Sequence, residues 1–482
     1  MKIAHSPYRP DPAYLGLGGA PFCDPVSPAD FPRAILRYRN DRWAGAVGLA
    51  HLSDEEWTRH FARFHPLPDN LPTPLALRYH GHQFRVYNPD LGDGRGFLFA
   101  QLRDPQGRLL DLATKGSGKT PYSRTADGRL TLKGGVREIL ATEMLEALGV
   151  YTSKTFSVIE TGESLHRNDE PSPTRSAVLV RLGHGHVRFG TFQRLAFEED
   201  RAAIGRLIDY CAEAFEPDLA GAENLPSRWF ARVVARTARL AAQWMAAGFV
   251  HGVLNTDNMT VTGESFDYGP WRFLPYTDLS FTAAYFDQSG LYAYGRQPDA
   301  ALWNLTRLGG ALTLVAETDA LNESLQIFPQ AFERAMVEAF FARLGVNPAG
   351  EGDFDFIVTL LQWMEATKIP FERVFFDWFC GAASTHRALA SPHAALYTDA
   401  AFAPLRARIE SLAPAGPARL AHPYFAGEPC TMLIDEVEAI WSAIAERDDW
   451  SALEEKLGAI SAMREAHAFD ASRFADVVSN NA

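Results

Sequence analysis

Apolar residues between positions 97 and 195 fall into short runs that are separated by turn-forming residues. Two of these runs, residues 97–102 and 109–115, flank the string Asp104-Pro105-Gln106-Gly107, which is typical of a hairpin turn. Further runs at 156–159 and 177–180 indicate two more strands. This part of the chain is therefore predicted to form a β-sheet.

Helical spacing occurs once within that strand-rich part and dominates after residue 200. Over residues 136–148 apolar residues recur every third or fourth position, and Gly149 follows as a stop. Later in the chain the same spacing predicts helices over 229–247, 302–314, 332–344, 356–366 and 434–444. The first 70 residues are instead rich in proline, and they contain one predicted helix, 54–64, with Ser53 as its N-cap.

Together these elements predict an α+β protein with the bilobal layout of protein kinases. A β-rich N-lobe holds one prominent helix, and a larger helical C-lobe follows it. We place an N-terminal extension at residues 1–70, the N-lobe at 71–195, and the C-lobe with a C-terminal extension at 196–482.

Composition narrows the class of protein. The 482 residues are 47% hydrophobic and carry a net charge of −13, so the basic surface that a nucleic-acid partner requires is not expected. The four cysteines are scattered without a Cys-x-x-Cys pair, which argues against a zinc site and favours a reducing compartment. The first residues lack the apolar run of a signal peptide, and no stretch approaches the ~20 apolar residues of a membrane span. We expect a cytoplasmic protein with no membrane partner.

Two acidic strings carry the strongest chemical signal. Asn258 ends Asn255-Thr256-Asp257-Asn258, and Asp267 lies in Phe266-Asp267-Tyr268-Gly269, with a short apolar stretch between the strings. An amide and a carboxylate on two neighbouring strands, both directed at one divalent cation, suit phosphoryl and nucleotidyl transfer. We therefore predict Asn258 and Asp267 as ligands of Mg²⁺ or Mn²⁺, which in turn holds the triphosphate of ATP.

The usual catalytic base of a protein kinase is missing. A kinase has an aspartate soon after its catalytic-loop histidine, in a His-Arg-Asp motif, whereas this chain has His251-Gly252-Val253. Asp257 is the nearby carboxylate that can accept a proton from an incoming hydroxyl, so we predict it as the catalytic residue.

Upstream residues are arranged in the order of a kinase-like nucleotide site. Gly92-Asp93-Gly94-Arg95-Gly96 precedes a strand, and its glycines would let backbone N–H groups approach phosphate, although a plain tight turn is the alternative. Lys115 ends a strand and Glu138 lies on the following helix, which suits either an ion pair that presents the ammonium group to ATP or two surface charges. Arg181 and Arg188 would pair with either a triphosphate or a carboxylate.

Two other motifs are not expected to bind phosphate or metal. Gly116-Ser117-Gly118-Lys119-Thr120 imitates the end of a P-loop, but Ala113 replaces its first glycine, and Pro121 follows where a helix should begin. The pairs His80-Gly81-His82 and His184-Gly185-His186 have a metal-site spacing. Without acidic or sulfur ligands nearby in sequence, we expect them to pack or form hydrogen bonds.

The ordered set of motifs resembles the selenoprotein O family. The resemblance covers about residues 80–270 and rests on Gly81-His82-Gln83-Phe84, Leu91-Gly92-Asp93-Gly94-Arg95, Lys115-Gly116, Thr120-Pro121-Tyr122-Ser123-Arg124, Asp127-Gly128-Arg129, Arg137-Glu138, Val187-Arg188-Phe189-Gly190, His251-Gly252-Val253, Asn255-Thr256-Asp257-Asn258-Met259 and Phe266-Asp267-Tyr268-Gly269-Pro270. It implies a pseudokinase with a kinase-like fold that works as a protein adenylyltransferase, moving AMP from ATP to Ser, Thr or Tyr hydroxyls and releasing pyrophosphate. The nucleotide would lie reversed relative to a kinase, with its α-phosphorus facing the acceptor.

The resemblance also implies which residues bind the nucleotide. These are Gly92, Gly94, Arg95, Lys115, Asp127, Gly128, Glu138, Arg181, Arg188 and Asp267. Within this set Lys115 would bind phosphate and pair with Glu138, while Arg181 and Arg188 would clamp the buried end of the triphosphate. The metal ligands and the proton acceptor are those already predicted from the residues themselves.

The chain departs from the family at its C-terminus. Many members carry a selenocysteine or cysteine there, and some link it to a cysteine beside the segment that corresponds to Asp267. Here the sequence reads Val477-Val478-Ser479-Asn480-Asn481-Ala482, and Trp271 follows Gly269-Pro270. A redox switch of that form is therefore not expected.

Three functions stay open at this point. The first is transfer of AMP from ATP to protein hydroxyls. The alternatives are a kinase that transfers the γ-phosphate and an ATP-binding pseudokinase that acts as a scaffold. We expect ATP and hydroxyl-bearing proteins as partners, and a monomeric protein.

Overall fold

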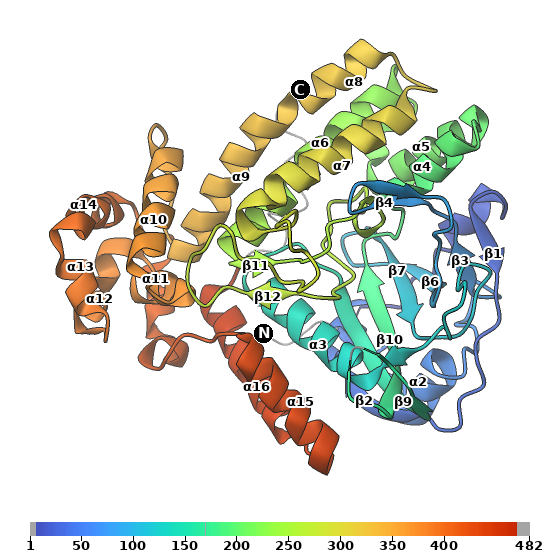
Figure 1. Cartoon of the computed structure of the whole chain (residues 1–482), viewed down its shortest axis with the longest axis horizontal. Coiled ribbons are helices and arrows are strands. Elements are labelled where there is room, and N and C mark those ends of the chain that lie inside the picture. The colour runs from blue at the N-terminus through green and yellow to red at the C-terminus, as the bar shows by residue number, and fades with distance from the viewer. Residues whose placement is uncertain (1–5, 169, 470–482) are drawn as a thin grey trace.

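The computed structural model describes residues 6–168 and 170–469. Strands gather on one side of the molecule, and long helices extend from them to the other side (Figure 1). The protein is therefore a mixed α+β structure with a mainly antiparallel sheet. The predictions drawn from the first five residues and from Val477-Val478-Ser479-Asn480-Asn481-Ala482 lie outside the described residues.

One large sheet organises the strand-rich half. The strands are β1 (Cys23–Pro25), β2 (Ile35–Arg39), β3 (Leu75–Leu77), β4 (Gly81–Gln83), β5 (Val86–Asn88), β6 (Gly96–Arg103), β7 (Leu109–Lys115), β8 (Leu130–Thr131), β9 (Lys154–Leu165), β10 (Thr174–Gly183), β11 (Phe249–Val250) and β12 (Arg272–Phe273). The order in the main sheet is β1-β3-β6-β7-β10-β9-β2, and β8 also pairs with β10. Each of these pairings is antiparallel.

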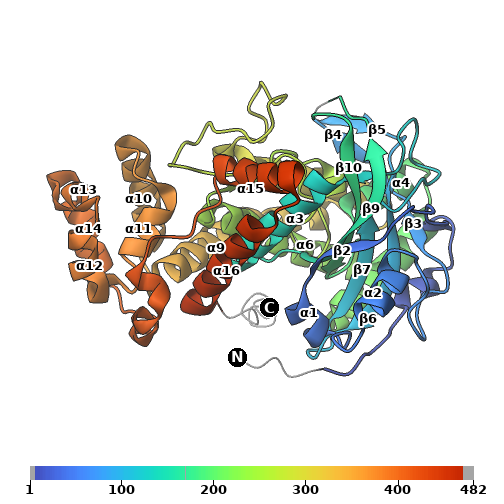
Figure 2. The ribbon, with the colours of Figure 1, turned by 90° about the horizontal axis from the view of Figure 1, so that it is seen from below.

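Helices make up most of the rest of the chain. They are α1 (Asp41–Ala46), α2 (Asp54–Phe61), α3 (Leu132–Ala147), α4 (Phe189–Phe197), α5 (Arg201–Phe215), α6 (Leu225–Ala246), α7 (Gln297–Leu312), α8 (Thr318–Leu325), α9 (Ile327–Leu344), α10 (Asp353–Thr367), α11 (Phe371–Asp377), α12 (Thr385–Ala390), α13 (Ala394–Thr398), α14 (Ala403–Ser411), α15 (Ile434–Arg447) and α16 (Ser451–His467). Helix α3 packs against β9 and β10 and also contacts α15 and α16 (Figure 2). Helix α6 packs against α7, α8 and α9.

Both faces of the main sheet are buried. Along β10, Ala177 and Leu179 belong to the core that includes α3, whereas Val178 and Val180 belong to a second core with Trp57 of α2. Because successive side chains of a strand point to opposite faces, a strand covered on both sides needs apolar residues at consecutive positions. This burial explains the unbroken apolar runs in the sequence.

The first seventy residues supply both edge strands of the main sheet. In β1, Cys23 lies opposite Leu77 of β3. In β2, Leu36 lies opposite Ile159 of β9. The same stretch contributes α1 and α2, so its proline-rich sequence is folded onto the sheet rather than detached from it.

The predicted strands and helices form, and only their ends differ. Helix α3 begins at Leu132, four residues before the predicted start, because the Thr131 hydroxyl accepts a hydrogen bond from the Gly134 N–H group (3.1 Å) and caps the helix there. Helix α2 has the predicted Ser53 cap but ends at Phe61, and the left-handed backbone of Phe64 (φ 57°) prevents its continuation.

Other predictions concern membranes, cysteines and the P-loop-like string. In the part of the chain that the structure describes, no helix is long and apolar enough to cross a membrane. The four cysteines are buried and unbridged. Residues 116–129 form turns and irregular backbone with no helix at Lys119, so the prediction that this string is not a true P-loop is confirmed.

Candidate active site

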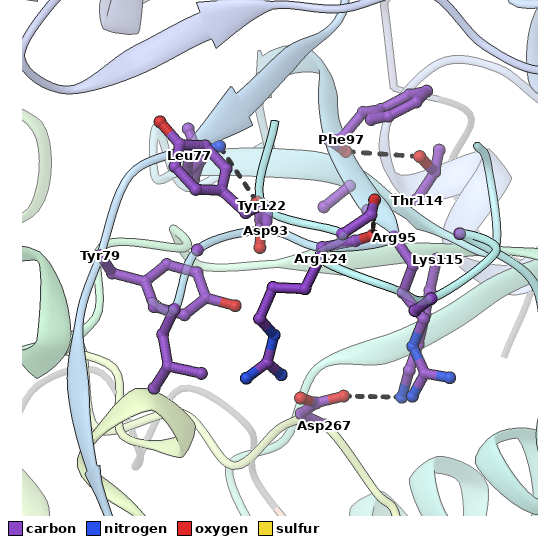
Figure 3. A pocket seen from close by; sticks show the side chains of 18 of the residues that line it. Leu77, Tyr79, Asp93, Arg95, Phe97, Thr114, Lys115, Tyr122, Arg124 and Asp267 are labelled. Atoms are coloured by element: carbon purple, nitrogen blue, oxygen red, sulfur yellow. Dashed lines mark hydrogen bonds and ion pairs between the residues drawn. The ribbon is translucent and has the colours of Figure 1, made fainter. Parts of the chain in front are cut away.

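A cavity of about 570 Å³ opens beside the glycine string, β7 and β10 (Figure 3). Of the residues predicted to bind nucleotide or metal, those that line it are Gly92, Gly94, Arg95, Lys115, Asp127, Gly128, Arg181, Arg188 and Asp267. Glu138, Asp257 and Asn258 do not line it. Glu138 reaches the cavity through its contacts with lining residues, as described below, and the other two lie in the neighbouring turn.

Close packing explains two of the glycines. A Cβ atom at Gly92 would overlap the Tyr122 ring, and one at Gly128 would overlap the carbonyl group of Gly118. Gly128 also has a φ of 73°, in the left-handed region that favours glycine. These glycines therefore let the loop before β6 and the turns after β7 close against each other at the cavity wall.

The buried carboxylate of Glu138 and the partly exposed carboxylate of Asp267 hold the cations Lys115 and Arg181 side by side. Lys115 Nζ donates hydrogen bonds to Glu138 Oε1 and Asp267 Oδ1, each at 2.6 Å. Arg181 Nη2 donates to the same two oxygens, at 2.8 and 2.6 Å respectively. Arg181 lies opposite Ala113 in the β7–β10 pairing, so it shares a sheet face with Lys115, and α3 brings Glu138 to that face.

The cations decide the charge state of both carboxylates. Burial alone would raise the pKa of Glu138 and of Asp267, because a charged group is less stable away from water. Arg181 and Lys115 outweigh this effect, so the pKa of Glu138 is lowered and that of Asp267 lies well below its usual range. Both carboxylates are therefore ionised at neutral pH, and the site holds paired charges that an incoming phosphate or metal ion can rearrange.

Backbone strain marks the position of Asp267. Its φ of 63° lies in the left-handed region, which is unfavourable for a residue with a side chain. The preceding carbonyl group, that of Phe266, lies 3.0 Å from His251 Nε2. The hydrogen bonds around Asp267 hold its carboxylate at the cavity despite this strain.

Arg188 links the cavity to the turn that carries Asp257. Its Nη1 donates to the Asp257 carbonyl oxygen at 2.8 Å, and its Nη2 donates to Asp93 Oδ1 at 3.1 Å. The guanidinium group also stacks over the Tyr79 and Phe266 rings, 4.4 and 4.8 Å from their centroids. Arg181 and Arg188 both pair with carboxylates, and both also line the cavity.

Asp257 is almost completely buried, with one carboxylate oxygen left unpaired. Among the residues that the structure describes, its Oδ1 has no hydrogen-bond partner. Burial raises the pKa of Asp257 to about 6, and the attraction of Arg188 only partly opposes this effect. A carboxylate in this state can take up a proton near neutral pH.

The two acidic strings do not lie on neighbouring strands, so that part of the prediction is wrong. Thr256–Asn258 form a short 3₁₀ turn, and Asp267 lies in irregular backbone. Side chains stabilise the turn: Thr256 Oγ1 accepts a bond from the His82 N–H group (2.7 Å), and Asn255 Oδ1 accepts one from the Phe84 N–H group (3.0 Å). The turn is therefore held by these side-chain hydrogen bonds to the β4–β5 hairpin, and not by backbone pairing between strands.

The outer part of the cavity contains a second group of charges around Asp127. Asp127 Oδ2 accepts a hydrogen bond from Arg167 Nη1 at 2.8 Å, and its Oδ1 accepts one from the Arg129 N–H group at 3.0 Å. The predicted site residue Asp127 thus forms an ion pair with Arg167 that the sequence did not indicate.

Several lining residues received no role from the sequence. They are Tyr79, Asp93, Tyr122, Arg124 and Arg167. Asp93 lies inside the glycine string, and Tyr122 and Arg124 lie in one of the strings that carry the family resemblance, so those signals were available. Arg167 lies in a loop outside every motif, and nothing in the sequence pointed to it.

The two histidine pairs form hydrogen bonds, as predicted. Their partners are Tyr87 for His80, Gln193 for His82, Tyr151 for His184 and Asp111 for His186. Within the described ranges there is no group of three or more His, Cys, Asp or Glu residues that could hold a metal ion.

Asn258 and Asp267 carry the kinds of oxygen atom that bind a hard divalent cation, and other ligands would complete its coordination. Asn258 Nδ2 donates to the Val253 carbonyl oxygen at 3.0 Å, which fixes the amide and leaves its oxygen as a possible ligand. Asp267 adds carboxylate oxygens, and the buried Asp257 Oδ1 lies unpaired in the adjoining turn. Amide and carboxylate oxygens are the ligands that Mg²⁺ and Mn²⁺ prefer.

The chain is similar to known proteins along most of its length. A family model described as protein adenylyltransferase SelO matches residues 8–461. A protein nucleotidyltransferase YdiU from Gloeobacter violaceus is 43% identical over 463 residues, which cover 93% of this chain and 94% of the relative. Proteins with the same name from Synechocystis and Vibrio cholerae are 49% and 36% identical, over 70% and 74% of this chain and 71% and 72% of their own lengths. The chain therefore belongs to the protein adenylyltransferase SelO family.

Proposed function

We propose that this protein transfers AMP from ATP to Ser, Thr or Tyr hydroxyls of other proteins and releases pyrophosphate. The observation that carries the proposal is the set of ion pairs among Lys115, Arg181, Glu138 and Asp267 at the cavity, found in a chain of this family. The set offers two cations to a triphosphate and one carboxylate to a metal ion. The names of the relatives, protein nucleotidyltransferases, support the same chemistry.

In this mechanism Lys115 and Arg181 bind the triphosphate, and the guanidinium group of Arg188 is a third cation at the cavity. With the β- and γ-phosphates held by Lys115, Arg181 and Arg188, the α-phosphorus faces the acceptor. The hydroxyl oxygen forms a bond to the α-phosphorus. At the same time, the bond breaks between the α-phosphorus and the oxygen that bridges it to the β-phosphorus. Charge then builds up on the leaving pyrophosphate, where the three cations stabilise it.

Asp257 would take the proton of the attacking hydroxyl. Its unpaired, buried Oδ1 and its raised pKa suit a proton acceptor, and its place beside Asn258 brings it next to the metal ligands. Asn258 and Asp267 would hold Mg²⁺ or Mn²⁺, which supplies positive charge to the phosphates when bound. This assignment explains how the chain can lack the His-Arg-Asp carboxylate.

We extend the proposal to the fold, the location, the oligomeric state and the metal ion. The sheet with α3 and its Lys115–Glu138 pair, followed by a helical half, supports a kinase-like bilobal fold. We also propose a cytoplasmic monomer that uses Mg²⁺ or Mn²⁺.

Labelled ATP tests the proposal. The purified protein is incubated with Mg²⁺, a mixture of cell proteins, and ATP labelled at either the α- or the γ-phosphate. Transfer of the α-label, with a protein mass gain equal to AMP, is the expected result. Transfer of the γ-label alone would establish the kinase alternative, and nucleotide binding without any transfer would favour the scaffold.

A further inference from the structure

A second cavity, of about 430 Å³, shares no lining residue with the nucleotide cavity. Its walls come from the turn between β6 and β7, the end of α5, helix α6 and the short turn Thr262–Gly263. That last turn lies in the chain between Asn258 and Asp267. The second cavity therefore adjoins the segment that carries the predicted metal ligands.

Four arginines line this cavity. They are Arg103 at the end of β6, Arg108 in the β6–β7 turn, and Arg236 and Arg239 from α6. Among the described residues, Glu213 is the one carboxylate in the lining. Like charges gathered around one space raise the local potential and favour an anionic ligand.

The carboxylates that pair with three of these arginines lie behind the lining. They are Asp11 with Arg103, Asp104 with Arg108, and Glu216 with Arg236. A guanidinium group has five N–H donors, and a carboxylate takes at most two of them in a bidentate pair. The pairs therefore hold the arginines in place and leave donors for a ligand.

His184 also lines the cavity but adds no positive charge to it. Its side chain lines the cavity, and its Nδ1 lies 2.6 Å from the Tyr151 hydroxyl oxygen. Burial, followed by the nearby Arg236 and Arg108, lowers the pKa of His184 well below its usual range. The histidine is neutral at physiological pH, so the positive charge of the lining comes from the arginines.

Apolar side chains complete the walls. Phe215, Pro217 and Leu240 line the cavity together with the ring of Tyr151. A volume of this size lies within the range of small-molecule sites. The combination suits a compact organic body that carries several negative groups, rather than a bare inorganic ion.

We propose that this cavity is an effector site for a small organic anion that carries two or more phosphate or carboxylate groups. Arg103 and Arg108 would bind one anionic group from the β6–β7 turn, and Arg236 would bind another from α6. The apolar walls would cover the body of the molecule. This site goes beyond the proposed transfer reaction, and its occupation by a ligand does not depend on that reaction.

A continuous set of contacts connects the effector site to the nucleotide cavity. A Cβ atom at Gly263 would clash with the Cβ of Arg236, so that turn lies directly against α6. The segment before the turn pairs with the one that carries Arg188: the Val261 N–H group donates to the Val187 carbonyl oxygen at 3.1 Å. A ligand that moves Arg236 therefore acts on backbone that is hydrogen-bonded next to Arg188.

Calorimetry with three probes tests the proposal. Fructose 1,6-bisphosphate presents phosphates on an organic body, citrate presents carboxylates, and inorganic pyrophosphate has no organic body. We expect saturable binding of one of the first two probes, with at least a tenfold loss of affinity in the double variant Arg103→Gln, Arg236→Gln. The variant Lys115→Ala, in the nucleotide cavity, should retain this binding.

A second measurement tests the effector role. The bound probe should change the affinity for ATP by about fivefold or more, and ATP should change the affinity for the probe by the same factor. Amide hydrogen exchange in the wild-type protein should slow at the β6–β7 turn and at Thr262–Gly263 when the probe is added, a readout that needs no variant.

Four results would overturn the proposal. They are no binding of either organic probe, binding that the arginine substitutions leave unchanged, binding that Lys115→Ala abolishes, and binding that leaves ATP affinity unaltered. The coupling measurement rests on the proposed nucleotide site, whereas probe binding does not. Failure of AMP transfer with probe binding intact would therefore count against the proposed function alone.

Discussion

Glu138 and Asp267 accept hydrogen bonds from one and the same ammonium group, that of Lys115. Two carboxylates so close to a common donor would repel each other without Lys115 and Arg181 between them. A triphosphate that binds these two cations therefore competes with Asp267 for its partners. Asp267 then needs another positive charge, and a divalent metal ion can supply it.

Metal removal should accordingly weaken nucleotide binding. We expect the affinity for ATP to fall by about tenfold or more in a chelator, since phosphate and Asp267 would compete for the same cations without compensation. Isothermal titration with and without Mg²⁺ measures the change. The variant Asp267→Asn should lose this metal dependence, whereas Asp278→Asn, on a nearby exposed loop, should keep it. Equal affinity for ATP with and without metal in the wild-type protein would contradict the idea that Asp267 gives up its cations to the triphosphate and binds the metal ion instead.

Loss of the proposed proton acceptor should affect turnover rather than nucleotide binding. Asp257→Asn keeps the size of the side chain and removes its ability to accept the proton, so we expect kcat for AMP transfer to fall by ~10²–10⁴. The dissociation constant for ATP should stay within a few-fold of the wild-type value. Asp299→Asn, at an exposed position near the start of α7, is the matched control. A kcat within threefold of wild type would exclude Asp257 from this role.

An added methyl group at Gly92 should disturb the cavity wall. Gly92→Ala places a Cβ against the Tyr122 ring, and such overpacking costs about 1–3 kcal/mol. We expect a lower melting temperature and roughly tenfold weaker ATP binding, measured by calorimetry. Gly310→Ala adds the same group in α7, where it meets no described atom within 4 Å beyond its chain neighbours and its own helix backbone, so it should leave ATP binding unchanged and should not lower the melting temperature. Unaltered ATP binding in Gly92→Ala would show that the glycine loop does not shape the nucleotide site.

The carboxylate of Glu146 should stabilise the fold in a pH-dependent way. On α3 it accepts hydrogen bonds from Arg42 Nη1 and Trp43 Nε1, each at 3.1 Å, and it lies 3.7 Å from Arg464 of α16. Burial would raise its pKa, but Lys154 and Arg42 lower it to about 2. The stabilisation is therefore complete above the ordinary pKa of a glutamate and is lost as the pH falls towards about 2.

Urea unfolding checks this prediction. Glu146→Gln leaves Arg42 and Lys154 without their carboxylate, so we expect a loss of ~3 kcal/mol in the free energy of unfolding at pH 7. The difference from wild type should shrink at about pH 3, because the unfolded state of the wild-type protein then binds a proton that the folded state does not. Glu446→Gln, at an exposed position on α15, should have no measurable effect at either pH. A constant difference across this range would show that the charge of Glu146 is not what stabilises the fold.

Local patterns carried most of the prediction of secondary structure. Asp104-Pro105-Gln106-Gly107 forms the hairpin between β6 and β7, because turn chemistry is encoded in adjacent residues. The helical spacing that begins near Val136 likewise identified α3, which is buried along most of its length. These two elements placed Lys115 at the end of a strand and Glu138 on the following helix, and the family resemblance implied that the two would pair.

Local sequence patterns could not predict contacts between residues that are far apart in the chain. The turn that carries Asp257 is shaped by Thr256 and Asn255, whose partners His82 and Phe84 lie more than 170 positions earlier in the chain. Likewise nothing next to Arg167 in the sequence indicates its ion pair with a residue forty positions away. The short strands β1 and β2 contain too few residues for a clear sequence pattern, and their pairing depends on partners that come later.

The two edge strands set an order of events during synthesis on the ribosome. Strand β2 emerges early, yet its partner β9 follows more than a hundred residues later, and β1 must likewise wait for β3. Until then the nascent N-terminal segment has no ladder to join, and the growing sheet exposes unpaired edges of the kind that promote aggregation. A chain that begins after this segment would keep those edges bare permanently.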